Sequence, residues 1–228
     1  MKKNIFAALL LMAAMQAVNA QKVVLHMAGN QKFECNVLQL DSITFEDDGF
    51  IVVDEHEWVD LGLPSGTLWA TCNVGANSPE EYGDYFAWGE TKPKENYSVD
   101  TYNYSGFVVI QDAATENWGY GWETPSIEHF QELINAENTT TEWITQNGVK
   151  GRLITSKKNG ESIFLPAAGC IGEFSLLAGS YGEYWSSTLY ADDINCSYAF
   201  SFDETYCGYG NGRRDYGRTI RPVRVKTR

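Results

Sequence analysis

Basic residues are scarce in this chain of 228 residues, in which 17 lysines and arginines stand against 30 aspartates and glutamates. The formal net charge at pH 7 is −13. Nucleic acids and anionic membrane surfaces attract proteins through basic patches. The charge balance therefore argues against both partners, and we expect no nucleic-acid ligand.

Long apolar runs are equally scarce, since the one extended run covers residues 5–15. It is too short to cross a bilayer as a permanent helix. It follows Lys2 and Lys3 and precedes a small-residue cleavage site that ends at Ala20, which is the pattern of a secretion signal over residues 1–20. The sequence therefore predicts no membrane span and an exported mature chain that begins at Gln21.

A lipoprotein anchor is not expected either, because the first cysteine, Cys35, lies far beyond the apolar run. Cleavage after Ala20 would remove two lysines and no acid, which takes the net charge from −13 to −15. We expect the mature protein to be periplasmic, exposed on the cell surface or secreted.

Histidines number only three, and His26, His56 and His129 are scattered outside any nucleophile or metal motif. His56 has acidic neighbours, but no second cluster completes a coordination shell, so a solvated linker is the favoured interpretation. The sequence therefore predicts no catalytic residue, no metal ion and no cofactor. We expect a protein that is not an enzyme.

Five cysteines occur without any Cys-x-x-Cys pair. An exported protein can form disulfides, and the odd number leaves at least one thiol free or paired between molecules. Cys196 and Cys207 are near enough in sequence to bridge neighbouring strands. The favoured alternative is that the cysteines are small buried residues, with at most one bridge among them.

Turn signals divide the mature chain into a short N-terminal β segment over residues 21–57 and a main domain over residues 58–228. The N-terminal segment contains four apolar runs typical of a small meander of hairpins, at residues 23–27, 33–40, 42–45 and 50–53. In the main domain, residues 58–70 predict two strands around a Pro-Ser-Gly turn. Residues 73–106 are loop-like, with an anchored aromatic segment at residues 85–90.

Two helices are predicted in the main domain. The first covers residues 112–118 and ends at Gly119. The second has Thr124 as its N-cap and Pro125 at its first position, and continues to about Ala136. Its apolar face consists of Ile127, Phe130, Leu133 and Ile134. Strands follow at residues 141–145, 151–156, 162–165, 184–188, 197–202 and 219–225, with Asn-Gly turns at 147–148 and 159–160. Few helices among many short strands indicate an α+β domain.

A family resemblance is carried by several long motifs of the main domain. They are Val59 to Ala70, Tyr82 to Glu90, Trp122 with Thr124 to Ser126, Phe164 to Gly169, Glu183 to Thr188, and Gly217 to Arg224. In this order they resemble the Fibrobacter succinogenes major paralogous domain family, from about Trp58 to Arg224. The family usually has an arginine after the tryptophan that precedes the helix, whereas this chain has Glu123.

The resemblance implies a C-type lectin-like fold, in the branch of formylglycine-generating enzymes and of the variable proteins of diversity-generating retroelements. The calcium-binding motifs of C-type lectins are absent, since Ser186 and Ser187 follow Trp185. A loop with Asp192, Asp193 and Asn195 offers oxygen ligands as a less favoured alternative. Cys196 and Cys207 do not match the reactive cysteine pair of the formylglycine-generating enzymes.

Thirteen tyrosines and seven tryptophans accompany many small polar residues. Tyrosine gives large contact area at low entropic cost, as in antibody loops. We therefore predict that loops between Tyr190 and Tyr216 bind a glycan or a protein. The candidate ligand-binding residues are Tyr190, Asp192, Asp193, Asn195, Tyr206, Tyr209, Asn211, Arg213, Arg214 and Tyr216. The alternative for such rings is packing in the core, which we expect for Trp69, Trp88, Trp122 and Trp185.

The basic residues gather near the C-terminus, where seven of the 17 lie between Arg213 and Arg228. We expect this basic segment to lie near an acidic surface of the same molecule, in preference to forming an anion site. The favoured function is an exported, non-catalytic binding module. The alternatives are a structural or adhesive component of a bacterial surface assembly, and a variable binding protein of a diversity-generating retroelement.

Overall fold

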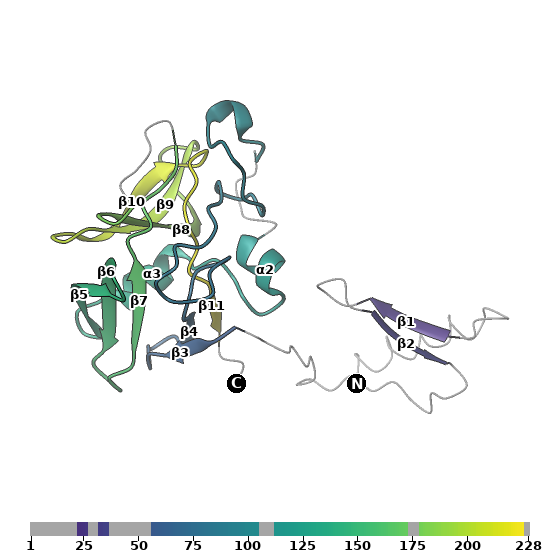
Figure 1. Ribbon diagram of the computed structural model, residues 1–228, viewed down its shortest axis with the longest axis horizontal. Helices are drawn as coiled ribbons and strands as arrows, with labels where there is room; N and C mark the ends of the chain where they lie inside the picture. The colour runs from purple at the N-terminus through teal and green to yellow at the C-terminus, as the bar shows by residue number, and fades with distance from the viewer. Residues whose placement is uncertain (1–21, 27–31, 37–55, 105–111, 173–177, 226–228) are drawn as a thin grey trace. The chain divides into compact units, whose positions relative to one another are not determined.

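The computed structural model describes residues 22–26, 32–36, 56–104, 112–172 and 178–225 (Figure 1). The chain divides into two compact units, Met1–Val52 and Val53–Arg228. The predicted signal and the predicted strands at residues 42–45 and 50–53 lie outside the described residues. In the described part of the chain, no helix has the length and apolar character needed to cross a bilayer.

The N-terminal unit contains an antiparallel hairpin of β1 (Lys22–His26) and β2 (Lys32–Asn36). Leu25 lies opposite Phe33 in its register. The first predicted hairpin of this segment is therefore confirmed. The predicted continuation of the second strand to Leu40 lies outside the described residues.

The described part of the main unit contains three small antiparallel sheets and few helices, so it is of mixed α+β type. One sheet has the order β11-β4-β3, with β3 (Trp58–Asp60), β4 (Thr67–Ala70) and β11 (Val223–Val225). The second consists of β5 (Thr139–Gln146), β6 (Val149–Ser156) and β7 (Ser162–Pro166). The third consists of β8 (Gly182–Leu189), β9 (Cys196–Phe202) and β10 (Cys207–Arg213).

The first sheet brings the two ends of the main unit together, because β4 pairs with β3 on one side and with β11 on the other. The turn between β3 and β4 is closed by a bond of 3.0 Å from the Gly66 N–H to the Leu63 carbonyl. The two strands predicted around this turn are confirmed. The last predicted strand is shorter than expected, since Thr219 forms only an isolated bridge with Tyr184.

Helix α2 (Ala113–Trp118) agrees with its prediction. The Asp112 carboxylate caps it by accepting from the N–H groups of Ala114 at 2.8 Å and Thr115 at 3.1 Å. The helix ends at Gly119, whose φ of 93° is a conformation that glycine adopts without strain.

Helix α3 (Ile127–Leu133) is shorter than predicted at both ends. The Thr124 N-cap prediction is wrong, because the N–H of Thr124 donates to Asp112 at 2.9 Å and Ser126 caps the helix instead. The predicted end at Ala136 is also wrong. The Leu133 carbonyl accepts from the Thr139 hydroxyl at 2.5 Å, and the chain turns there into β5.

The Asn147-Gly148 turn between β5 and β6 is confirmed, with φ values of 49° and 85°. Both values are positive, as a type I′ hairpin turn requires.

Two apolar clusters hold the main unit together. In the first, Phe130 of α3 stacks on Phe200 of β9, with ring centroids 4.8 Å apart. In the second, Trp88 and Trp185 are buried, and each indole N–H finds a carbonyl, Ser186 at 2.8 Å and Phe86 at 2.7 Å respectively. Burying one such ring is worth about 2–3 kcal/mol. The four tryptophans predicted in the core are all buried.

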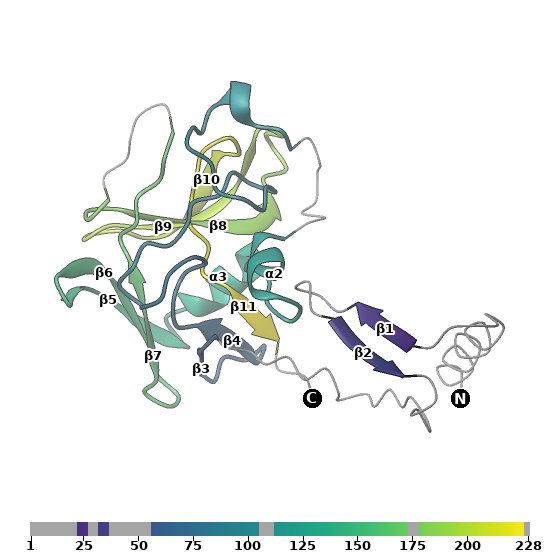
Figure 2. The same ribbon diagram turned by 45° about the vertical axis from the view of Figure 1, so that its right-hand side comes forward.

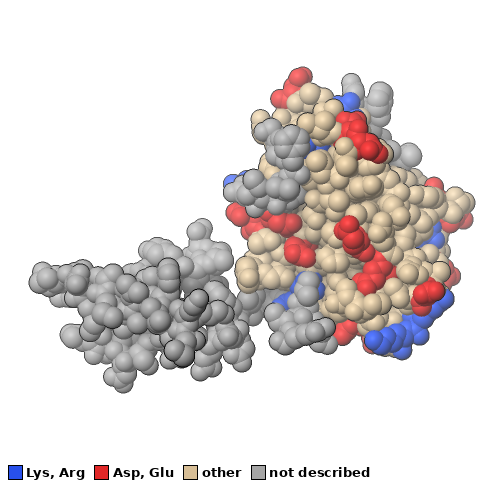
Figure 3. All heavy atoms as spheres, turned by 180° about the vertical axis from the view of Figure 1, so that it is seen from behind, with Lys and Arg blue, Asp and Glu red and all other residues tan. Residues whose placement is uncertain are grey.

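In the described part of the basic C-terminal segment, Arg213 and Arg218 pair with the carboxylates of Asp215 and Glu183. The acidic run of residues 46–55 lies outside the described residues, so the expected contact with an acidic surface stays a prediction. Arg214, Arg218 and Arg221 are buried. The Arg221 guanidinium donates to the Asn73 side chain at 2.8 Å and to the Thr71 carbonyl at 2.7 Å. A planar guanidinium suits carbonyl and amide oxygens, which accept hydrogen bonds from Arg221 here. On the face shown in Figure 3, acidic side chains lie in several separate patches.

Candidate functional site

A groove of about 760 Å³ opens where three segments of the main unit meet. The first segment carries the 3₁₀ helix η3 (Val99–Thr101), the second is the turn between β8 and β9, and the third follows β10. Figures 1 and 2 show the blue-green η3 turn near β10 at the top of the molecule. The groove is lined by Val99, Tyr102, Asn103, Tyr104, Asp193, Ile194, Asn195, Cys196, Arg213, Arg214 and Asp215.

The η3 segment is held in place by bonds to the chain around it. Lys94 pairs with Glu90 at 2.7 Å and donates to the Thr101 carbonyl at 2.8 Å. The Tyr102 hydroxyl donates to the carbonyl of the buried Trp88 at 2.8 Å. Burial raises the pKa of Tyr102 to about 12, so its hydroxyl stays protonated at neutral pH.

Arg214 joins the three segments from below. Its guanidinium donates to the Tyr102 hydroxyl and to the Ile194 carbonyl, both at 2.9 Å. It also lies over the ring of Trp88, with 4.4 Å between the guanidinium carbon and the ring centroid. Charge-assisted bonds and a cation–π contact in a buried place are among the stronger polar interactions in proteins. Arg214 therefore forms the buried floor of the groove and holds its three segments in position.

The turn after β8 is organised by Asp193. Its carboxylate accepts from the N–H of Asn195 at 2.9 Å, and this bond lowers the pKa of Asp193 below its ordinary value. The Asn195 carbonyl in turn accepts from the N–H of Arg214 at 2.9 Å. Asp193 therefore presents a charged carboxylate to the groove at neutral pH.

The third side of the groove carries a two-bond ion pair. The Arg213 side chain donates to both carboxylate oxygens of Asp215, each at 3.0 Å. Two exposed apolar side chains complete the rim, because Val99 is 65% exposed and Ile194 is 54% exposed. The groove thus combines tyrosine, amide and carboxylate groups with a small apolar rim, and its two arginines balance its two aspartates.

Cys196 lies at the groove but is a poor nucleophile. Burial, and then the nearby Asp193, raise the pKa of its thiol. The proposed bridge from Cys196 to Cys207 is not formed, since both thiols are free. The register places Cys196 opposite Arg213 and Cys207 opposite Phe202, at the two ends of the hairpin. Cys196 and Cys207 are close in sequence but distant in space, because the long antiparallel pair of β9 and β10 places them at its opposite ends.

The ten predicted ligand-binding residues fall into separate groups. Those at the groove are Asp193, Asn195, Arg213 and Arg214. Tyr190, Asp192 and Asn211 form a second group, in which the charge of Asp192 raises the pKa of Tyr190. Tyr206 and Tyr209 are exposed at the far end of the hairpin, and Tyr216 packs beneath Arg213 at 5.4 Å.

The segment from residue 190 to residue 216 is not the run of loops that the sequence predicted. Beyond the predicted strand β9, it contains the unpredicted strand β10, which pairs with β9 along its whole length. Alternate glycines at 208, 210 and 212 have low β propensity, so the strand depends on this pairing.

The predicted site residues do not include the groove residues Val99, Tyr102, Asn103 and Tyr104. Tyr102 and Asn103 have the same tyrosine and amide character as the predicted loops. The missing information was spatial, because Tyr102 meets Arg214 across 112 residues of sequence.

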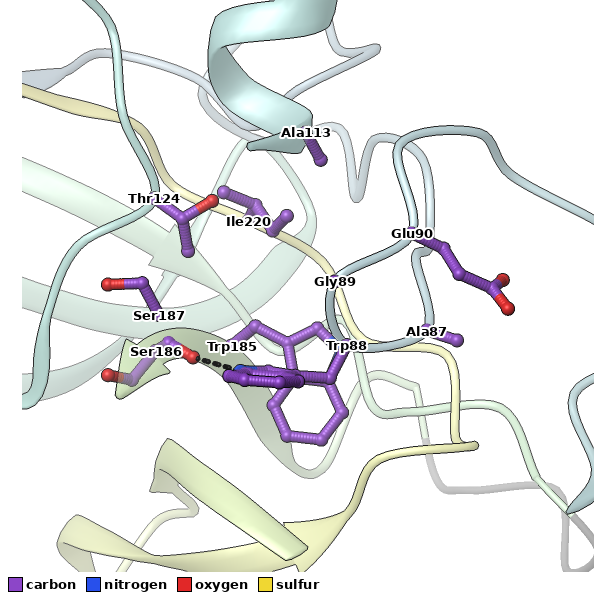
Figure 4. A pocket seen from close by; sticks show the side chains of 10 residues that line it. All are labelled: Ala87, Trp88, Gly89, Glu90, Ala113, Thr124, Trp185, Ser186, Ser187 and Ile220. Carbon is purple, nitrogen blue, oxygen red and sulfur yellow. Dashed lines mark hydrogen bonds between the residues drawn. The ribbon is translucent and has the colours of Figure 1, made fainter. Parts of the chain in front are cut away.

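Two other features of the described residues bear on the site. No group of three or more His, Cys, Asp or Glu side chains in the described ranges could hold a metal ion. A second pocket, between Trp88 and Trp185, measures only about 10 Å³ (Figure 4). That volume admits about one water molecule. The large groove is therefore the better candidate for a ligand.

Comparisons of the chain with family models, with curated proteins and with solved structures find no match.

Proposed function

We propose that the main unit is a non-catalytic binding module that recognises a glycan or a protein segment in this groove. The supporting observation is the groove of about 760 Å³ lined by tyrosine, asparagine and aspartate. Ligand pockets commonly have volumes of about 300–1,000 Å³. Tyrosine faces suit sugar rings, and amides with carboxylates suit sugar hydroxyls, so a glycan with no net charge is the better fit.

We also propose that the protein is exported and that the main unit has a C-type lectin-like fold related to the Fibrobacter succinogenes major paralogous domain. The motifs of residues 59–70 and 217–224 support the relationship. A further support is the sheet in which β4 lies between β3 and β11, since the resemblance implies adjacent terminal strands.

A glycan array followed by calorimetric titration tests the groove. We expect a glycan to bind the mature chain, and we expect the double variant Val99→Ser and Ile194→Ser to weaken binding by about tenfold, or 1.4 kcal/mol. Both side chains are exposed, so the melting temperature should not change.

Ile171→Ser is the matched control, because Ile171 is also an exposed isoleucine and does not line the groove. Equal affinity of the double variant, the control and the unmodified chain would exclude the groove as the binding site.

A further inference from the structure

Strand β10 forms an open edge of its sheet. It pairs with β9 on one side and, among the described residues, with no strand on the other (Figure 1). An unpaired edge is a template for another extended chain. Natural edges are commonly protected by lysine, proline or a bulge, and β10, whose sequence is CGYGNGR, has none of these.

The register shows which backbone groups of β10 point outward. Asn195 and Arg214 form a bonded pair at the open end of the hairpin, with an N···O distance of 2.9 Å. Bonded and non-bonded pairs alternate along an antiparallel ladder. Counting from Arg214, the pairs that contain Asn211 and Tyr209 are non-bonded ones. Their N–H and C=O groups therefore point away from β9.

Most of these outward groups have no partner within the described part of the chain. The N–H groups of Tyr209 and Asn211 and the carbonyl of Asn211 make no other hydrogen bond there. The Tyr209 carbonyl accepts only the Tyr206 hydroxyl, at 3.4 Å. Beyond Asn211, the Arg213 carbonyl is occupied by the Arg218 guanidinium at 3.0 Å. The open edge is therefore centred on Gly210.

Glycines leave a shelf beside this edge. A side chain at Gly208 would meet the Tyr206 hydroxyl, and one at Gly212 would meet the Arg218 guanidinium. At Gly210, in contrast, no atom lies within 4 Å of an added Cβ. The shelf thus has one open position between two boundaries, and it can receive a single large side chain from a neighbouring strand.

We infer that β10 docks an extended polypeptide segment of a partner protein. The segment adds a fourth strand to the sheet β10-β9-β8 and places one large apolar or aromatic side chain over Gly210. The backbone bonds supply affinity and the shelf supplies specificity, as in other cases of strand addition. The inference is independent of the groove and its ligand.

A second copy of this chain is a poorer occupant of the edge. Two β10 strands that hydrogen bond through Tyr209 and Asn211 must pair odd-numbered residues with odd-numbered ones. When Tyr209 of one copy pairs with Asn211 of the other, Gly210 lies opposite Gly210. When Tyr209 or Asn211 pairs with its own counterpart, Gly210 still lies opposite a glycine, Gly208 or Gly212. The shelf would remain empty, whereas a partner segment with a large side chain fills it.

The test uses a phage-displayed library of random extended peptides, selected on the mature chain, with the selected peptides then titrated by fluorescence anisotropy. We expect the selected sequences to share one large apolar or aromatic residue. Asn211→Pro removes the outward N–H and no bond to β9, so it should weaken binding by about tenfold or more. Asn211→Ala loses the same side chain, keeps the N–H and should change affinity by less than about threefold.

A second variant covers the case in which Asn211→Pro does not fold, as judged by its melting temperature. Gly210→Val fills the shelf with a residue that favours strands, and it should also weaken peptide binding by about tenfold. The groove variant Ile194→Ser should leave peptide binding unchanged, which separates this site from the proposed groove.

Failure to select any peptide, or equal binding to the unmodified chain and both variants, would overturn the inference. Sedimentation of the mature chain as a dimer that Asn211→Pro converts to a monomer would overturn it as well, by assigning the edge to a second copy.

Discussion

Arg214 and Arg218 lie close together in sequence and in similar surroundings, yet they serve different regions of the main unit. Arg218 lies 4.1 Å above Trp185 and pairs with the Glu183 carboxylate at 2.8 Å. All three side chains are buried. Because the pair and the ring beneath it are closed off from solvent, this region is framework.

Arg214 lies 4.4 Å above Trp88 and bonds to the Tyr102 hydroxyl instead of a carboxylate. Among the described residues it also donates to the loop carbonyls of Ile194 and Tyr104, and above it lies the groove of about 760 Å³. The same arginine–tryptophan unit therefore closes the interior in one place and supports a binding surface in the other. Among the described residues, Arg214 bonds to a tyrosine hydroxyl and to loop carbonyls, whereas Arg218 pairs with a buried carboxylate.

Replacement of the framework arginine should have the largest effect. Arg218→Met leaves the Glu183 carboxylate buried without its partner, which should lower the free energy of unfolding in urea by about 3–5 kcal/mol. Addition of Glu183→Gln should recover much of that loss. An unchanged unfolding midpoint for Arg218→Met would contradict the framework role.

Replacement of the groove arginine should have a smaller effect on stability and a specific effect on binding. Arg214→Lys keeps the charge but not the planar fork, so we expect a loss of about 2 kcal/mol in urea unfolding together with weaker ligand binding. Arg213→Lys is the matched control, because the Arg213 side chain is 47% exposed and a lysine keeps its charge beside Asp215, so the loss should be about 0–1 kcal/mol. Equal losses of stability and of affinity in the two variants would mean that Arg214 supports the groove no more than Arg213 does.

A buried thiol in the framework region should make the free energy of unfolding depend on pH. Burial raises the pKa of the Cys170 thiol from 9.0 to about 12. Below pH 9 the thiol is protonated in both the folded and the unfolded protein, so it does not change the free energy of unfolding with pH. Between pH 9 and about 12 the thiol ionises in the unfolded protein first, and this ionisation favours unfolding. The free energy of unfolding should therefore fall by up to about 1.4 kcal/mol per pH unit above pH 9.

Cys170→Ala should show a shallower fall above pH 9 in the same urea titrations. Parallel curves for the two proteins would mean that this thiol is not held protonated by the framework.

Loss of one hydroxyl at the groove should have the smallest effect. Tyr102→Phe removes the group that donates to the Trp88 carbonyl and accepts from Arg214. We expect the free energy of unfolding to fall by about 1 kcal/mol. Tyr209→Phe, at an exposed ring, should change it by less than about 0.5 kcal/mol. A loss at Tyr209 as large as the loss at Tyr102 would contradict the supporting role of the Tyr102 hydroxyl at the groove.

The sequence predicted the elements whose signals are local. Helix α2 carries its own cap, Asp112, and its own stop, Gly119, so its bounds agreed closely with the structure. The Thr124 cap failed because Thr124 bonds to Asp112, which belongs to another helix. Local signals indicate that a helix exists, but distant partners decide where it begins.

The groove was predictable only in part for the same reason. Asp193 and Asn195 were found because they share one polar turn. Tyr102 was not among the predicted site residues, because its partner Arg214 is distant in sequence. Arg214 was a predicted site residue, but its burial beneath the groove was not predicted. Composition indicated tyrosine-rich recognition, while the position of the site depended on contacts that only the fold supplies.

The most direct test of the groove is a titration of ¹⁵N-labelled protein comprising residues 21–228, followed by NMR, with the glycan selected on the array. The groove proposal predicts that the amide signals of Asn103, Ile194 and Asn195 shift together, while those of Asn159 and Gly160 in the β6–β7 turn stay in place. Shifts confined to the turn at residues 203–206, or to any surface away from the groove, would contradict it.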